Sequence, residues 1–279
     1  MTTNEETPLV SCLCVTRGKP QKLQKAIQCF QAQSYHNREL IIVFEDDDLA
    51  TIDFVRSLDR DQGIRCLKLG SSPKLTLGQL RNRAIEFSKG TFFCQWDDDD
   101  WYHCDRLSVQ LTAAMSGYND ASVMTNWILF DEIERQGYFS LFRLWEGSVL
   151  CKKEVVNKEL CYPSMSKGED SIFINNLVEA HRVIPVINPN LYIYSCNGAN
   201  VSSRGHFDFM FSRSQRLSPR LSKTITDILH SRYSIEEGSE ILNTKEVLAE
   251  FKYFAFNNIN ITNEEIAQYL KTTNTSAQH

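Results

Sequence analysis

The chain has 279 residues, of which 42% are hydrophobic and 23% charged, and its formal net charge at pH 7 is −5. This composition is typical of a globular protein with a large core, and the acidic balance argues against nucleic acid as a partner. No apolar run reaches the roughly 18 to 20 residues of a membrane span, and residues 1–7 are too polar for a signal peptide. We therefore expect a cytoplasmic protein.

Apolar runs alternate with helical patterns in the first part of the sequence. The apolar runs predict buried strands at residues 9–15, 40–44, 64–69 and 92–96. Apolar residues at helical spacing predict helices within 23–30, from about residue 77 and again from residue 107. This alternation predicts an α/β fold with a parallel sheet covered on both faces, whose ligands bind beyond the carboxyl ends of the strands.

Acidic residues follow two of these strands directly. Residues 45–48 (Glu-Asp-Asp-Asp) follow the second strand, and residues 97–100 (four Asp) follow the fourth. Adjacent carboxylates repel one another at low dielectric, so a fold that gathers them favours a hard divalent cation, with a solvated turn as the alternative. A calcium loop of the EF-hand kind is excluded because Trp101 and Tyr102 stand where it needs Asp or Asn and then Gly. The side chains expected to converge on one crevice are Thr16, Glu45, Asp46, Asp97, Asp98 and Asp99.

Two nucleotide-binding signatures are missing from the sequence. No Gly-x-Gly-x-x-Gly follows the first strand and no Gly-x-x-x-x-Gly-Lys-Ser/Thr occurs, which argues against a dinucleotide oxidoreductase and a P-loop NTPase. Residues 46–48 imitate the Asp-x-Asp-x-Thr/Val signature of haloacid dehalogenases, but Ala50 stands at its last position.

The second half is less regular. We expect β-rich runs at 121–130 and 140–150, short strands at 183–187 and 191–195, and loops at 197–200 and 205–207. Glu169 and Asp170 begin a helical run, where they either satisfy the helix start or act in catalysis. Polar, helix-compatible sequence with apolar stripes predicts a helical extension at 217–279 on a domain of residues 1–216.

The order and spacing of several short segments resemble those of a family 2 glycosyltransferase of the GT-A fold. They are residues 15–20, 39–48, 78–82, 90–100 and 105–107, and the resemblance extends over about residues 8–210. It implies a mostly parallel, Rossmann-like central sheet flanked by helices. It also implies a nucleotide-sugar donor, usually linked to UDP, and a Mn²⁺ or Mg²⁺ ion held by a DxD motif.

The resemblance implies roles for single residues. Asp99 would bind the metal ion directly, while Asp97 or Asp98 would reach the ribose or metal-bound water. Thr16 and either Glu45 or Asp46 would face the uracil and ribose. The segment that contacts the nucleotide also includes Arg17, where the family usually has an aromatic or similar residue, and Arg81, which would meet the diphosphate. His206 would be a further metal ligand or would contact the leaving group. The alternative is that His206 is a loop histidine with no role beyond the structure.

A second set of residues would handle the acceptor. Glu169 and Asp170 resemble the family's acidic pair, with Asp170 as general base, and Trp145, Glu146 and Gly147 resemble the loop bordering sugar and acceptor. The implied reaction is a metal-dependent, inverting transfer of a hexose from a UDP-sugar to a hydroxyl of a glycan or lipid-linked acceptor. The rival functions are nucleotidyl transfer to a sugar phosphate and non-catalytic binding of a nucleotide sugar. Phenylalanines and arginines within 207–220 indicate either a buried helix with a solvated basic face or peripheral contact with the inner face of a membrane.

Overall fold

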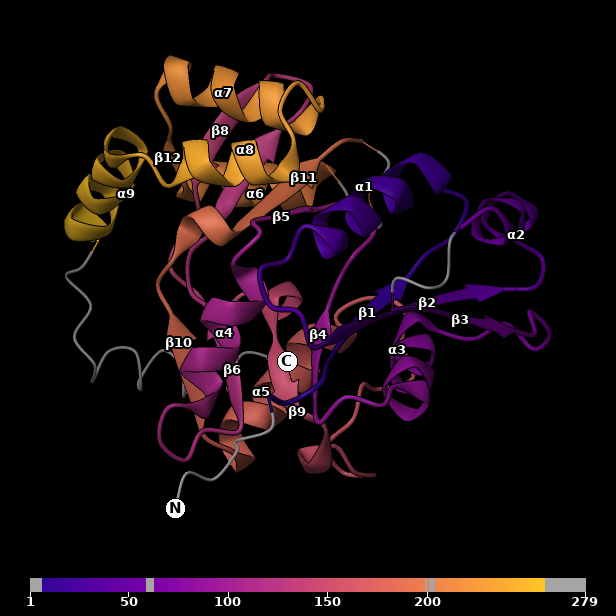
Figure 1. Ribbon diagram of the computed structural model, residues 1–279. Helices are drawn as coiled ribbons and strands as arrows, with labels where there is room; N and C mark the ends of the chain where they lie inside the picture. Colours follow the sequence, from indigo (N-terminus) through magenta and orange to yellow (C-terminus); the bar gives the residue numbers. More distant parts are fainter. Residues whose placement is uncertain (1–6, 59–62, 199, 201–203, 259–279) are drawn as a thin grey trace.

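The computed structural model describes residues 7–58, 63–198, 200 and 204–258. Two sheets and the helices around them form the molecule (Figure 1). The larger sheet has the strand order β10-β6-β9-β4-β1-β2-β3. Its strands are β1 (Val10–Val15), β2 (Arg38–Glu45), β3 (Ile64–Leu69), β4 (Phe92–Gln95), β6 (Ala121–Met124), β9 (Leu150–Lys152) and β10 (Val183–Val186). The pairs β1–β2, β2–β3, β1–β4 and β6–β10 are parallel, and β9 runs antiparallel between β4 and β6, so the predicted, mostly parallel sheet is confirmed.

Helices cover both faces of this sheet (Figure 1). They are α1 (Pro20–Gln31), α2 (Leu49–Arg56), α3 (Leu77–Phe87), α4 (Arg106–Met115) and α5 (Glu169–Ala180). Successive strand residues point to opposite faces. Cys12 and Cys14 therefore join the apolar cluster that contains α1, α2 and α4, whereas Leu13 joins the cluster that contains α3 and α5.

Local signals account for the starts of these helices. Pro20 occupies the first turn of α1, where its missing N–H costs nothing. The Asp48 side chain caps α2 by accepting from the Thr51 amide, and Thr76 and Gln79 form a capping box at α3. Each cap lies directly after the turn that follows a strand, so each helix begins close to the carboxyl edge of the sheet.

A second, smaller sheet has the order β12-β8-β7-β11-β5. Its strands are β5 (Trp101–Tyr102), β7 (Ile128–Asp131), β8 (Gln136–Phe139), β11 (Tyr192–Cys196) and β12 (Gln215–Arg216). The apolar run predicted at 121–130 is divided between the two sheets, with β6 in the larger and β7 in the smaller. This sheet lies beside the acidic segment 97–100, because β5 begins at the next residue.

The run at 140–150 was wrongly predicted as one β-rich stretch. The backbone bends after β8 and forms a 3-10 helix, η2 (Glu146–Ser148), before β9. Serine side chains replace strand partners there: the Trp127 amide donates to Ser140 Oγ at 3.0 Å, and the Met124 amide donates to Ser148 Oγ at 2.8 Å. Such bonds offer the backbone an alternative to a strand ladder.

The C-terminal helices pack over the smaller sheet (Figure 1). They are α6 (Arg204–Arg213), α7 (Pro219–Leu229), α8 (Ile235–Leu242) and α9 (Lys245–Asn258). The loop predicted at 205–207 is wrong, because these residues lie in α6, where Phe207, Met210 and Phe211 are buried at helical spacing. Apolar residues of α7, α8 and α9 belong to the same core cluster as both sheets. The division at residue 216 stays a prediction.

Within the ranges that the structure describes, no helix combines the length and the apolar character needed to cross a bilayer.

Candidate active site

The carboxyl ends of β1, β2 and β4 lie next to one another because the three strands are adjacent and parallel. Thr16 follows β1, Glu45 is the last residue of β2, and the four aspartates follow β4 by one residue. Thr16 Oγ1 donates to Asp98 Oδ2 at 2.6 Å. The structure thus brings Thr16 and Asp98 into contact.

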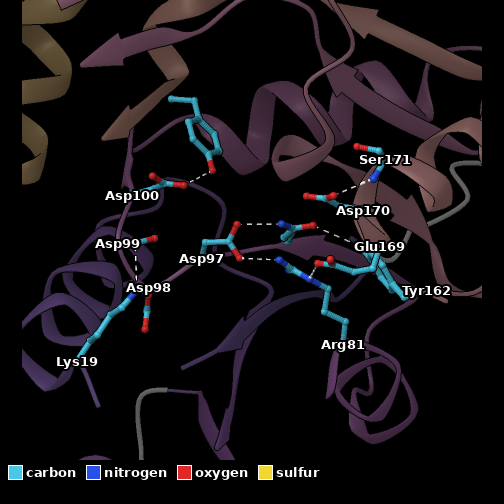
Figure 2. Close-up of polar contacts among 12 residues, drawn as sticks. Lys19, Arg81, Asp97, Asp98, Asp99, Asp100, Tyr162, Glu169, Asp170 and Ser171 are labelled. Carbon is cyan, nitrogen blue, oxygen red and sulfur yellow. Dashed lines mark hydrogen bonds and ion pairs between the residues drawn. The ribbon is translucent and has the colours of Figure 1, made fainter. Parts of the chain in front are cut away.

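The four consecutive aspartates, residues 97–100, point in different directions (Figure 2). Asp97 is directed toward Arg81, whereas Asp98 and Asp99 lie beside Lys19. Asp100 accepts a hydrogen bond from the hydroxyl of Tyr192 in β11. One acidic run therefore contacts three different parts of the fold.

Asp98 and Asp99 both lie within ion-pair distance of the Lys19 ammonium. Lys19 Nζ lies 3.0 Å from Asp99 Oδ2 and 3.6 Å from Asp98 Oδ1. Burial, and then the neighbouring charge of Asp99, raises the pKa of Asp98 to about 6. Carboxylates gathered in this way could hold a hard divalent ion, and in this structure the Lys19 ammonium supplies the positive charge beside them. Sequence reasoning missed Lys19, although its position between the first strand and Pro20 was the available signal.

Asp100 is buried and contacts the smaller sheet. Its carboxyl group is buried, bonds to Tyr192 Oη, and accepts from the Ser195 amide at 3.4 Å. Burial and the charges of Asp99 and Asp97 raise its pKa well above the usual value, which favours the neutral form. Asp100 therefore ties the acidic segment to the smaller sheet.

Arg81, expected at the diphosphate, is buried between two acids. Its Nη2 lies 3.2 Å from Asp97 Oδ1, and its Nε donates to Glu169 Oε1 at 3.1 Å (Figure 2). Gln95 Nε2 also donates to Asp97 Oδ2, at 2.8 Å, and the Arg81 guanidinium lies over the ring of Tyr162. Arg81 thus links the strand-end acids to the acidic pair at the start of α5.

Gly78 makes that link sterically possible. A Cβ atom at this position would lie 1.9 Å from the carbonyl oxygen of Pro163, and the Gly78 amide donates to Met165 O at 3.0 Å. Only glycine lets α3 approach the segment that leads into α5 so closely. This approach brings Arg81 and Glu169 within ion-pair distance.

Asp170 differs from its neighbour Glu169. Its Oδ1 accepts from the Ser171 amide at 2.8 Å, and the helix N-cap itself is Gly168, at φ 74°. Burial, followed by the charge of Glu146, raises the pKa of Asp170 to about 6, although Arg81 opposes the shift. A carboxylate with such a pKa can accept a proton near neutral pH. Its contact with the first-turn amide is also what a helix-start role requires.

The three residues at 145–147 fall into different environments. Trp145 is buried and stacked on Trp127 with 4.6 Å between ring centroids. Glu146 accepts from Ser171 Oγ at 2.9 Å and so lies at the start of α5, close to Asp170. A Cβ at Gly147 would come within 3.2 Å of the Trp145 ring. Of the three, Glu146 is the residue with a direct contact to the acidic pair's helix.

Glu45 and Asp46, the two acids expected near the uracil and ribose, differ in their burial and in their contacts. Glu45 is buried, its Oε2 pairs with Arg17 at 3.0 Å, and its Oε1 has no hydrogen-bond partner among the described residues. Asp46 is exposed and accepts from the Ser71 amide at 2.9 Å. Arg17 is half-exposed and also pairs with Asp47 at 2.8 Å. The open acceptor at this edge is therefore Glu45 Oε1.

His206 lies on an exposed part of α6. Partial burial lowers its pKa, Arg143 lowers it further, and Glu146 raises it, so these two are its charged neighbours. In the described part of the chain, the side chains close enough to hold an ion in one group are His103, Cys104 and Asp105, without Asp99 or His206.

His103 has a structural role in that group. It is buried, its Nε2 lies 3.1 Å from Ser239 O, and its Nδ1 accepts from the Asp105 amide at 3.0 Å. Both ring nitrogens are therefore engaged in tying the residues after β5 to α8.

Comparison with known proteins gives a family match over the same region. The model described as Glycosyl transferase family 2 matches residues 11–161, more than half of the chain. The amylovoran biosynthesis glycosyltransferase AmsB of Erwinia amylovora is 33% identical over 87 residues, which cover 31% of this chain and 29% of that protein. The GalNAc(5)-diNAcBac-PP-undecaprenol β-1,3-glucosyltransferase of Campylobacter jejuni is 27% identical over 176 residues, 63% of this chain and 54% of that protein. The chain thus spans from under a third to about half of the length of these relatives.

Solved structures share the fold. The S. aureus TarS fragment 1-349 in complex with UDP-GlcNAc has a TM-score of 0.56 at 12% identity, over 87% of this chain and 78% of that one. The mannosyltransferase PcManGT from Pyrobaculum calidifontis, in complex with GDP-Man and Mn²⁺, has a TM-score of 0.55 at 13% identity, over 99% of this chain and 82% of that one. At such identities the likeness speaks for the fold alone, and it confirms the expected GT-A architecture.

Proposed function

The chain belongs to glycosyl transferase family 2, and we propose that it transfers a hexose from a UDP-sugar to a hydroxyl group of a glycan or lipid-linked acceptor, with inversion at the anomeric carbon. One observation carries the proposal. Two carboxylates with raised pKa values, Asp98 and Asp170, stand on either side of Asp97 and Arg81. Asp98 lies beside the Lys19 ammonium at a strand end, and Asp170, which accepts a hydrogen bond from the Ser171 amide, lies at a helix start.

The donor side would use the edge of the larger sheet. Thr16 and Glu45 would face the nucleotide, and the buried Glu45 Oε1, which lacks a partner among the described residues, offers an acceptor for a base N–H or a ribose hydroxyl. This favours Glu45 over Asp46 for the role that the sequence left open. The nucleotide sugars bound by the two structural neighbours support a donor of this class, and the TarS complex supports UDP in particular.

Asp99, with Asp98 beside it, would hold a Mn²⁺ or Mg²⁺ ion at the position that the Lys19 ammonium now neutralises. When bound, such an ion neutralises the charge that grows on the departing diphosphate. The Mn²⁺ in the mannosyltransferase complex supports a metal at this kind of site.

Asp170 would act as the general base. The acceptor oxygen forms a bond to the anomeric carbon while the bond from that carbon to the diphosphate oxygen breaks, and the hydroxyl proton passes to Asp170. Glu169 is held by Arg81 and is less available for that step, which supports Asp170 as the base. Arg81 would position Asp97 and Glu169, and its two ion pairs support this role over direct diphosphate contact.

The acceptor is proposed from a relative. The Campylobacter protein is named for a substrate linked through a diphosphate to undecaprenol. A lipid-linked acceptor would bring this chain to the inner face of a membrane. The exposed Phe209 in α6, with the Arg213 guanidinium over its ring, is suited to such a peripheral contact.

Release of nucleotide diphosphate from a panel of UDP-sugars and GDP-mannose, with Mn²⁺ and with excess EDTA, tests the proposal. We expect slow UDP release without acceptor, dependent on the metal ion and faster when an acceptor is added. Tight binding of a nucleotide sugar with no release under any condition would contradict transfer and favour a non-catalytic binding protein.

A further inference from the structure

A cavity of about 630 Å³ is lined in part by the acidic segment, but by neither Arg81 nor Asp170. One wall is α1, one end is formed by residues 98–101, and the other wall is the segment joining α7 to α8. Ser195 of β11 also lines it. Cavities of this size accommodate small organic ligands.

Three polar atoms of the cavity residues lack partners. Lys22 Nζ, Trp101 Nε1 and Ser195 Oγ are buried atoms with no hydrogen bond among the described residues. Trp101 and Ser195 are 5% and 1% exposed, so solvent does not freely replace the missing bonds. Buried polar groups are normally hydrogen-bonded, and three exceptions around one cavity indicate that a ligand supplies their partners.

The other cations of this cavity are already engaged. Lys25 Nζ donates to Leu229 O at 2.7 Å, and Arg232 Nη1 donates to Asp227 Oδ1 at 2.8 Å. Burial lowers the pKa of Lys22, although the charges of Asp99 and Glu132 oppose the shift. Among the lysines and arginines that line the cavity within the described part of the chain, Lys22 is therefore the one whose side-chain nitrogen lacks a hydrogen-bond partner.

Carboxylates share the walls with that cation. Asp99, Glu132 and Glu236 line the same cavity, so its charge is mixed and gives no net attraction for an anion. A neutral ligand with many hydroxyl groups suits this lining, because each hydroxyl can donate to a carboxylate and accept from an ammonium or an indole N–H.

We propose that this cavity is a carbohydrate subsite that binds a sugar unit of the acceptor remote from the hydroxyl that is glycosylated, through Lys22, Trp101 and Ser195. The inference rests on the proposed glycosyl transfer. The sugar unit is a remote one because Asp98, Asp99 and Asp100 line the cavity and the proposed base Asp170 does not. Asp170 lies on the other side of Asp97 from Asp98 (Figure 2). An acceptor would have to contain more than one sugar unit to occupy both places.

Variants that remove only the unpaired atoms test the site. Lys22→Met, Trp101→Phe and Ser195→Ala each delete a polar atom that makes no hydrogen bond within the described residues. We therefore expect thermal unfolding midpoints equal to or above that of the wild-type chain. Cellobiose, lactose and N,N′-diacetylchitobiose serve as probes in saturation-transfer NMR, and we expect at least one to bind the wild type and to bind each variant roughly tenfold or more weakly.

Lys25→Met is the matched control. It makes the same charge change on the same helix, but its amine is directed to Leu229 O, so we expect little change in disaccharide affinity. UDP release from a UDP-sugar in the absence of acceptor should be unchanged in Trp101→Phe, Ser195→Ala and Lys25→Met, because the proposed donor groups do not include these residues. Lys22→Met is left out of this comparison, since the Lys22 ammonium lies in the field of Asp99.

The outcomes separate this inference from the proposed function. A wild-type chain that releases UDP but binds no disaccharide, or variants that bind as well as the wild type, would overturn the subsite. Binding of inorganic pyrophosphate that is lost in Lys22→Met, without sugar binding, would overturn it in favour of an anion site. Absence of UDP-sugar turnover would count against the proposed function, while disaccharide binding lost in the variants would still support the cavity as a sugar site.

Discussion

Arg81 and Glu169 form a buried ion pair, with 3.1 Å between Nε and Oε1, although 88 residues separate them in the chain. The same guanidinium pairs with Asp97, so α3 joins the acidic end of β4 to the start of α5. The geometry between the proposed metal-binding and base carboxylates therefore depends on one arginine.

Replacing Arg81 by Met should destabilise the fold. The change leaves Asp97 and Glu169 without their buried partner, and breaking a buried pair typically costs about 3 to 5 kcal/mol. Denaturant unfolding monitored by tryptophan fluorescence measures the loss. Arg83→Met on the same helix is the control, since Arg83 is exposed and pairs with Glu86 one turn away, and it should change stability by at most about 0.5 kcal/mol. Equal losses for the two variants would contradict the linking role of Arg81.

Replacing Asp99 by Ala should abolish metal-dependent donor binding. Asp99 is the acid beside Asp98 that faces Lys19, and removing it leaves one carboxylate to hold the ion. Titration calorimetry with UDP and Mn²⁺ should show a loss of at least about tenfold, or roughly 1.4 kcal/mol. The adjacent variant Asp100→Asn should retain UDP affinity, because Asp100 is buried against Tyr192 and favours its neutral form. Undiminished affinity in Asp99→Ala would remove Asp99 as the metal ligand.

Replacing Asp170 by Asn should lower the transfer rate by roughly 10² or more, the range expected for a general base. The pH profile of the wild-type enzyme gives a second readout. The base must be unprotonated, and its pKa is raised to about 6. The rate should therefore fall about tenfold per unit as pH drops below 6 and level off above it. Near-normal turnover in Asp170→Asn would leave Asp170 with the helix-start role.

The raised pKa of Asp170 also predicts that the stability of the fold decreases as pH rises, whereas the transfer rate increases. Since the pKa of Asp170 is raised to about 6 in the folded state and is about 3.9 in an unfolded chain, folding favours the protonated form. This contribution is present at pH 4 and is lost as pH rises through 6. Asp170→Asn mimics the neutral form, so it should be more stable than the wild type by about 1 to 3 kcal/mol at pH 7 and equal to it at pH 4.

Denaturant unfolding at the two pH values checks that difference. Asp53→Asn is the control, because Asp53 is exposed on α2 and only pairs with Arg56, one turn away. It should show no gain at pH 7. A wild type as stable as Asp170→Asn at pH 7 would mean that Asp170 is not desolvated in the folded state.

Adding a methyl group at Gly78 should disturb both stability and transfer. The Cβ of Gly78→Ala would lie 1.9 Å from a backbone oxygen of Pro163, which cannot move without shifting the segment before α5. We expect a loss of at least about 1 to 3 kcal/mol together with reduced transfer, as Arg81 and Glu169 separate. Gly70→Ala is the control, because its Cβ would have no atom within 4 Å. Unchanged unfolding in Gly78→Ala would show that α3 and this segment can part at little cost.

The strands that carry the acids were predictable because their signal is local. Residues 40–44 are an uninterrupted apolar run, residues 92–96 are apolar except for Gln95, and each segment is followed at once by carboxylates. Their arrangement at one edge follows from the parallel order that alternating strands and helices impose. The placement of Thr16 beside Asp98 needed no information beyond this.

Long-range pairings could not be predicted in the same way. The pairing of Arg81 with Glu169 depends on the approach of α3 to residues 163–165, which a single sequence does not encode in any short pattern. The division of 121–130 between two sheets had only a weak signal, the polar Thr125-Asn126 pair inside an apolar run. Only the start of helix α6 was missed, because Gly205 suggested a loop at 205–207, whereas a buried helix was one of the two interpretations of residues 207–220. Burial of Phe207 and Phe211 against the smaller sheet outweighs the low helix propensity of glycine.

The divergent orientation of the aspartates at 97–100 makes the length of that run as important as its acidity. Substituting one aspartate removes the contacts of that side chain alone. Deleting one residue would instead shift each later side chain of the run into the position, and toward the contacts, of the residue before it. Asp97 faces Arg81 of α3, and Asp100 faces Tyr192 of β11. The number of residues between these two aspartates therefore fixes how far the segment reaches from α3 to the smaller sheet. Insertions and deletions in this run should therefore be tolerated less well than substitutions, even where the substituted residue is not an acid.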